Sequence, residues 1–267
     1  MDAFLRVEFE AAVSRISQLD GFYAEHLGLE PSGEHRFWCG ESELVFKAGP
    51  GEPFYHFAFL VPGDRFDDAL AWARARVDLL PGGDADEVIF DFAAWNALAF
   101  YFLDPAENIV ELIAHRGLAE SGRTGDFVAA EFIGVSEVGL VGDPTLIAAG
   151  LERLGVRLWD GSVGPGDLAF FGERGKVLIL SPEERGWLPN RRPAQAFPVD
   201  LLLSGASRGD VTVCGHRIRQ ECRATGPDAR LPECAGMSLE GDRESACGHP
   251  GTAAVGTPCD SSRGRGG

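Results

Sequence analysis

One stretch, residues 53–115, limits the fold more than any other part of the chain. Its pieces FYHFAFLVP, FDDALAWARARV, FAAWNALAFYFLDPAEN and IVELIAHR stand in that order. The first, third and fourth pieces carry short apolar runs that predict buried strands. The second has apolar residues three and four positions apart, which predicts a helix. The stretch therefore predicts a strand, a helix over about 65–77, and three further strands near 88–92, 97–103 and 109–114.

Two ionisable side chains lie inside these apolar strands. Successive strand residues point to opposite faces, so His56 shares a face with Ala58 and Leu60. Glu111 likewise shares a face with apolar neighbours. A buried, ionised carboxylate is costly unless something pairs with it, and a bound cation would serve.

The same order of elements recurs on both sides of this stretch. Residues 4–47 predict a strand, a helix over about 14–27 and short strands, and residues 131–203 predict a third copy. In the third copy Asp143 caps a helix that begins at Pro144 and ends near Gly155. We therefore expect an α+β protein made of repeated βαβββ units, each roughly sixty residues long.

The composition excludes several classes of function. The 267 residues carry a formal net charge of −17, with a pI near 4.7. Such a chain lacks the basic face that nucleic acids or anionic membranes require. The first residues do not resemble a secretion signal, and no apolar run is long enough to span a bilayer. We expect a cytoplasmic protein that acts on a small molecule.

The composition changes at about residue 206. Residues 206–267 contain no Phe, Trp, Tyr or Lys, and they hold five of the six cysteines. Such a segment buries little apolar surface, so we expect a dispensable, disordered tail. The abrupt change in composition also suggests a coding sequence read out of frame after Gly205. A zinc site is the alternative, although no pair has CxxC spacing. Its ligands would come from Cys214, His216, Cys222, Cys234, Cys247 and His249.

Four short motifs together resemble the vicinal-oxygen-chelate superfamily, which includes glyoxalase I, bleomycin-resistance proteins and extradiol dioxygenases. They are Phe22-Tyr23 with Leu27-Gly28-Leu29, His56 to Phe59, Tyr101-Phe102 with Asp104-Pro105, and Asn108 to Glu111. The resemblance covers residues 1–116 well and residues 131–205 more loosely. It implies that residues 1–116 form two paired modules, an open barrel around a divalent metal ion, and that residues 131–205 form a third module.

The resemblance also implies the metal ligands. They would be Glu8 on the first strand of module one, His56 on the first strand of module two, and Glu111 on its last strand. Many relatives carry histidine at the place of Glu8. Two carboxylates and one imidazole would suit Mn, Ni, Zn or Fe and lean away from the two-histidine set of ring-cleaving oxygenases. The resemblance thus implies a glyoxalase-like lyase or isomerase in which Glu8 or Glu111 moves the proton.

Other interpretations of these residues stay open. A backbone carbonyl would satisfy His56, an arginine would satisfy Glu111, and Glu8 would be solvated. Without metal, two facing carboxylates would raise one pKa and create a general base. The alternative functions are a metal-free binding protein, as in bleomycin resistance, and an extradiol dioxygenase.

The third unit has Glu137 at its first-strand ligand place but Ile179 at its last. The third unit thus lacks a full ligand set and has no partner module. We expect it to pack on the first two units or to pair with its counterpart in a homodimer. Five residues outside the ligand set remain candidates. Trp95 and Asn96 would line a pocket mouth or pack in the core, and the segment with Trp187, Arg191 and Arg192 would form a lid, an anion site or an anchored loop.

Overall fold

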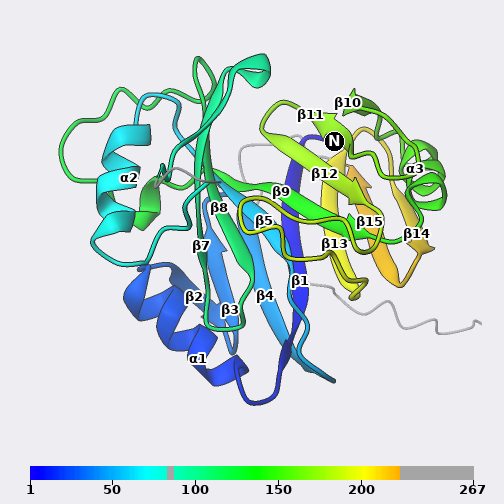
Figure 1. The fold of residues 1–267 in the computed structure, drawn as a ribbon, viewed down its shortest axis with the longest axis horizontal. Coiled ribbons are helices and arrows are strands. Elements are labelled where there is room, and N and C mark those ends of the chain that lie inside the picture. Colours follow the sequence, from blue (N-terminus) through cyan, green and yellow to red (C-terminus); the bar gives the residue numbers. More distant parts are fainter. Residues whose placement is uncertain (83–86, 223–267) are drawn as a thin grey trace, which may run out of the picture. The chain divides into compact units, whose positions relative to one another are not determined.

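The computed structural model describes residues 1–82 and 87–222 (Figure 1). Its strands form two sheets. Sheet A has the order β14-β15-β13-β1-β4-β3-β2, and sheet B has the order β10-β11-β12-β9-β5-β8-β7-β6. None of the helices in the described part of the chain is long and apolar enough to cross a membrane.

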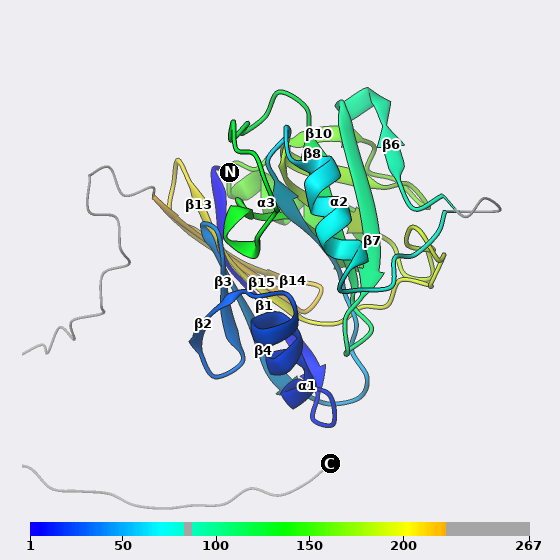
Figure 2. The same ribbon diagram turned by 90° about the vertical axis from the view of Figure 1, so that its left-hand side faces the viewer.

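The first unit lies in sheet A. In β1 (Ala3–Ala12) the buried Val7 and Phe9 alternate with the partly exposed Glu8 and Glu10. The predicted helix is present as α1 (Ile16–Asp20), which continues into a π-helical stretch, η1 (Gly21–His26). The remaining strands are β2 (Glu30–Gly33), β3 (Arg36–Cys39) and β4 (Ser42–Gly49). Figure 2 shows α1 beside this part of sheet A.

The second unit lies in sheet B and follows the prediction closely. It begins with β5 (His56–Val61), all six residues of which are buried. The helix is α2 (Phe66–Arg74), with Phe66, Ala69 and Leu70 on its buried face. Then follow β6 (Phe90–Phe92), a short 3-10 helix η2 (Ala93–Trp95), β7 (Ala97–Leu103) and β8 (Ile109–His115).

The hairpin between β7 and β8 fixes the register that places Glu111. Asp104 Oδ1 accepts hydrogen bonds from the backbone amides of Ala106 (2.9 Å) and Asn108 (3.0 Å). Glu107 takes the left-handed conformation, with φ +64°. The Asn108 side chain accepts the Tyr55 amide at 2.8 Å, which ties the hairpin to the start of β5.

The third unit begins, after η3 (Ala129–Glu131), with β9 (Gly134–Val141). The helix α3 (Pro144–Arg153) starts as predicted, because Asp143 Oδ1 accepts the amides of Thr145 (2.8 Å) and Leu146 (3.3 Å). Its strands are β10 (Leu158–Gly161), β11 (Ala169–Glu173) and β12 (Lys176–Ser181). The α+β class and the repeated βαβββ units are confirmed.

The predicted tail is ordered at its beginning. After β13 (Val199–Gly205) come β14 (Gly209–Val213) and β15 (His216–Cys222), so a boundary at residue 206 is wrong. Ile218 is fully buried, and Gln220 donates to the Leu154 carbonyl at 3.0 Å. This short segment forms strands despite its composition because β13 offers it a parallel edge. Residues 223–267 lie outside the described residues, and with them Cys234, Cys247 and His249 of the predicted zinc site.

The units combine differently from the expected order. We expected units one and two to share a barrel. Instead, β5 of unit two pairs with β9 of unit three in sheet B, and β1 of unit one pairs with β13 in sheet A. In Figure 1 the blue β1 and the yellow β13 lie side by side. The third unit therefore has its partner within the chain, which removes the reason for expecting a homodimer, and the homodimer itself stays a prediction.

Residues of both sheets, such as Phe9 and Phe57, pack together in the main hydrophobic core. The two sheets differ in the side chains that they carry on the opposite face. On sheet B this face is a second apolar cluster that includes Ala58, Tyr101 and Ile113. On sheet A it carries charged side chains such as Arg6, Glu8 and Lys47. The two ionisable residues predicted in unit two therefore lie in an apolar interior, and Glu8 does not.

Candidate metal centre

Three side chains from three neighbouring strands meet on the apolar face of sheet B. The residues are His56, Glu111 and Glu137, and each offers one ligand atom within 4.8 Å of the other two. No other such group of three occurs in the described ranges. The strand register explains the meeting. Ala58 of β5 stands opposite Glu111 of β8 and opposite Glu137 of β9. His56, two residues before Ala58, shares its face, and the small Ala58 side chain leaves the space between the carboxylates free.

All three side chains are shielded from solvent. His56, Glu111 and Glu137 are 5%, 2% and 3% exposed. The His56 Nδ1 atom lies 3.2 Å from the Ile109 carbonyl oxygen, and its Nε2 atom lies 3.5 Å from Glu111 Oε2. With the proton on Nδ1 donated to that carbonyl, the Nε2 lone pair faces the carboxylates, which is the tautomer that a metal ligand needs.

Burial governs the electrostatics of the cluster. It lowers the pKa of His56 to about 4, with the Ile109 carbonyl acting in the opposite direction, so the imidazole is neutral near pH 7. Burial raises the pKa of Glu111, the neighbouring Glu137 raises it further, and a hydrogen bond from Tyr101 opposes both. Burial also raises the pKa of Glu137. Two acids are thus held together with no positive charge between them.

The donors fit a divalent cation. In the described part of the chain no arginine or lysine pairs with Glu111 or Glu137, and Glu137 Oε1 is buried without a hydrogen-bond partner. An arginine partner for Glu111, one of the open interpretations, is therefore wrong for these residues. The carbonyl partner of His56 exists, and it is also what orients a ligating histidine. A cation would neutralise both carboxylates.

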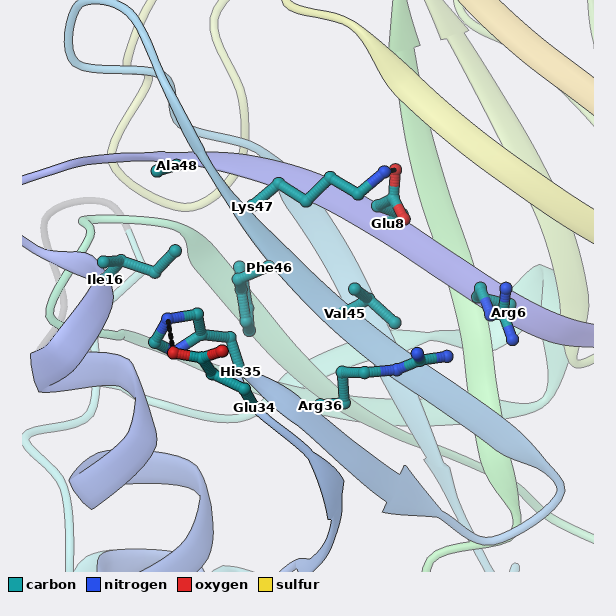
Figure 3. Close-up of a pocket in the computed structure, with 10 residues that line it drawn as sticks. All are labelled: Arg6, Glu8, Ile16, Glu34, His35, Arg36, Val45, Phe46, Lys47 and Ala48. Carbon is teal, nitrogen blue, oxygen red and sulfur yellow. Dashed lines mark ion pairs between the residues drawn. The ribbon is translucent and has the colours of Figure 1, made fainter.

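Glu8 does not belong to this cluster. Its carboxylate pairs with Lys47 on sheet A, and its side chain is 17% exposed (Figure 3). Glu8 does hold the place in unit one that His56 holds in unit two. The error lies in the pairing of units, because unit one faces β13 and not unit two. The structure therefore does not bring Glu8 together with His56 and Glu111, as its expected role as a ligand and proton carrier requires.

Glu137 takes the place that was assigned to Glu8. Its signal in the sequence was a single acid in the apolar run GVSEVGLV, at the first-strand ligand place of unit three. Unit three by itself has no full ligand set, because Ile179 occupies its last-strand place. The structure shows that unit two supplies two of the three donors to a site shared with unit three, so a full set within unit three is not needed.

An aromatic side chain covers the centre. The rings of Trp187 and His56 have centroids 5.0 Å apart, and Trp187 is 5% exposed. Gly139 permits this approach, because a Cβ there would lie 2.9 Å from the Trp187 ring. Arg192 holds the same segment by donating to the Glu107 carbonyl at 3.0 Å. Of the three interpretations of this segment, the anchored loop agrees with the structure, and the loop lies over the centre.

Trp95 packs and does not line a pocket mouth. Its ring centroid lies 4.8 Å from those of Trp159 and Phe170, and its indole donates to Asp160 Oδ2 at 2.5 Å. These contacts join the β6 end of sheet B to the β10 end. The Asn96 side chain donates to the Arg116 carbonyl. Trp95 therefore helps to curl sheet B, and Asn96 ties the start of β7 to the end of β8.

Comparison with known proteins gives structural likeness only. No family model matches the chain, and no curated protein matches its sequence. A protein from Bacillus subtilis described as a candidate dioxygenase is 13% identical, with 82% of this chain and 84% of that chain covered and a TM-score of 0.49. Glyoxalase I from Zea mays is 16% identical, with 74% of each chain covered and a TM-score of 0.43. Lactoylglutathione lyase from Agrobacterium tumefaciens is 18% identical, with 43% of this chain and 94% of that chain covered and a TM-score of 0.33.

Proposed function

We propose that this chain is a metal-dependent enzyme of the glyoxalase type, a lyase or isomerase acting on a small molecule with adjacent oxygens. The observation that carries the proposal is the buried group of His56, Glu111 and Glu137. It holds two acids and a neutral imidazole, and no arginine or lysine of residues 1–82 and 87–222 balances them. A mixed nitrogen and oxygen set suits Mn, Ni, Zn or Fe. A divalent ion held there would act as a Lewis acid on the substrate oxygens.

The protein groups would have distinct roles. His56 would bind through Nε2 while the Ile109 carbonyl orients its ring. Glu111 is held by Tyr101 and contacts His56, so it would serve as a fixed ligand. Glu137 has a free Oε1, and we assign to this atom the acceptance and return of the substrate proton. Trp187 would exclude water from the reaction.

The alternatives are less well supported by the donor set. An extradiol dioxygenase commonly presents two histidines and one carboxylate to iron, and this centre has one histidine and two carboxylates. A metal-free binding protein would have to bury two unbalanced acids beside its ligand, at a cost that the hydrogen bond from Tyr101 to Glu111 offsets only in part. A cytoplasmic location stays a prediction from the sequence.

Elemental analysis of protein purified without chelator tests the proposal. We expect about one divalent ion per chain in the wild type and negligible metal in His56→Ala and Glu137→Gln. Glu8→Gln is the matched control, because it makes the same change at the equivalent place in unit one, and it should bind metal as the wild type does. Equal and negligible metal in all four proteins would leave the metal-free binding protein as the better explanation.

A further inference from the structure

The charged face of sheet A carries an open cavity of about 490 Å³. Its cationic lining residues are Arg6 of β1, Arg36 of β3 and Lys47 of β4, and Val45 supplies apolar surface between them (Figure 3). In Figure 3 the Arg36 side chain extends toward Arg6 at one end of the cavity, and Lys47 reaches Glu8 above them. The His56 centre lies on the other sheet, so this cavity is separate from it.

One buried carboxylate holds both arginines. Glu43 is 4% exposed and accepts Arg6 Nε at 2.7 Å. It also accepts Arg36 Nε at 3.0 Å and Arg36 Nη2 at 2.8 Å, and Ser32 adds a hydroxyl at 2.9 Å. Because four donors converge on two oxygens, the guanidinium groups are fixed in position without help from any ligand.

The arginines have donors left over. Within residues 1–82 and 87–222, neither Arg6 Nη atom nor Arg36 Nη1 has a hydrogen-bond acceptor. The two side chains are 29% and 36% exposed, so these donors are accessible from the cavity. The two guanidinium groups and Glu43 sum to a charge of about +1. Of the acids that line the cavity, Glu8 is paired with Lys47, and Glu34 is 90% exposed and stands beside His35.

We propose that this cavity binds an oxyanion, a carboxylate or phosphate group, between Arg6 and Arg36. Guanidinium groups present planar pairs of N–H donors that match the oxygens of both anions. Glu43 does the positioning before the ligand arrives, which lowers the entropy cost of binding. Val45 would contact the carbon part of an organic ligand.

Titration of the full-length protein at low salt tests the site. Inorganic phosphate and succinate serve as separate probes, so that the result names the anion, and binding is followed by calorimetry. We expect saturable binding of at least one probe by the wild type. Arg6→Gln and Arg36→Gln should weaken that binding by about tenfold or more, because each loses charged hydrogen bonds to the anion.

Two controls make the result specific. Arg217 lies on the same face of sheet A but pairs with Asp210 and is 53% exposed, so Arg217→Gln should bind the probe as the wild type does. His56→Ala should also bind it normally, whether or not the metal proposal holds. Should the glutamine variants fail to fold, Arg36→Lys serves instead. It keeps the positive charge but lacks the planar pair of N–H donors, so it should bind the anion more weakly than the wild type does. Absence of saturable binding of both probes, or equal affinity in the arginine variants, would overturn the proposal.

Discussion

Glu8 and Lys47 form an ion pair in sheet A at the places that His56 and Glu111 hold in sheet B. The register makes the correspondence plain. Glu10 stands opposite Lys47 just as Ala58 stands opposite Glu111, and Glu8 and His56 each precede that residue by two. Lys47, at the last-strand place, neutralises Glu8, which would otherwise need a bound cation. The repeated unit therefore keeps its geometry in sheet A and has different chemistry.

Ala58, which stands between Glu111 and Glu137, should control metal binding. Ala58→Val adds two methyl groups between Glu111 and Glu137, so we expect metal affinity to fall by at least about tenfold and stability by about 1–3 kcal/mol. Ala58→Gly is the matched control, because it leaves the space open and should keep the metal. Metal content and thermal unfolding measure both effects, and normal metal content in Ala58→Val would contradict the geometry.

Trp187 should control access to the centre. Trp187→Ala removes the ring over His56, so the metal should pass to an added chelator faster than in the wild type. The lost packing should cost about 3–5 kcal/mol. Trp187→Phe retains an aromatic ring and should release metal at a rate closer to that of the wild type. Stopped-flow mixing with a coloured chelator gives the rates, and identical rates in all three proteins would show that Trp187 is not a barrier.

Glu43 should make stability depend on pH. Burial by itself would raise its pKa, but the hydrogen bonds from Arg36, Arg6 and Ser32 outweigh burial and lower the pKa below its usual value of 4.5. A lowered pKa means that the folded state binds fewer protons than the unfolded chain. Glu43 therefore contributes stability above pH 4.5 that is lost as the pH falls through the folded pKa.

Glu43→Gln should accordingly lower the free energy of unfolding by about 1–3 kcal/mol at pH 7, with a smaller difference at pH 3. Glu8→Gln is the control, since its lysine partner is 63% exposed and such a pair contributes less than about 1 kcal/mol. Urea unfolding at both pH values measures the difference, and a difference that grows toward acid would show the sign to be wrong.

The start of the predicted tail should be needed for folding. A chain shortened to end at Gly205 loses β14 and β15, and with them the burial of Ile218 and the hydrogen bond from Gln220 to Leu154. We expect it to unfold at a lower temperature than a chain that ends at Cys222. Burial of Ile218 alone contributes about 2 kcal/mol. Equal melting temperatures would restore the view that the segment after Gly205 is dispensable.

The sequence was sufficient for local features. Alternation placed His56 and Glu111 on the buried face of their strands, and the Asp143 cap and Pro144 placed the start of α3. These features depend on residues close together in the chain, so their patterns can be read directly. The α+β class followed from repetition of the same pattern.

The sequence did not reveal which units pair. Whether β5 lies beside a strand of unit one or of unit three depends on contacts between distant residues, and the apolar runs of all these strands look alike. Glu8 was therefore placed in the centre and Glu137 left out of it. The same difficulty hid β15, because its alternating Ile218 and Gln220 become meaningful only beside β13.

The strands β5 and β9 pair with each other, and both lie between β1 and β13 in the sequence, which also pair. One sheet is therefore built from a segment enclosed by strands of the other. Sheet B uses consecutive units and is complete once β12 has been synthesised, whereas β1 has one edge without a neighbour until β13 follows. During synthesis that edge is open to any other strand that approaches it. The sheet with the proposed metal centre can thus form early, and the sheet that begins the chain is the last to be finished.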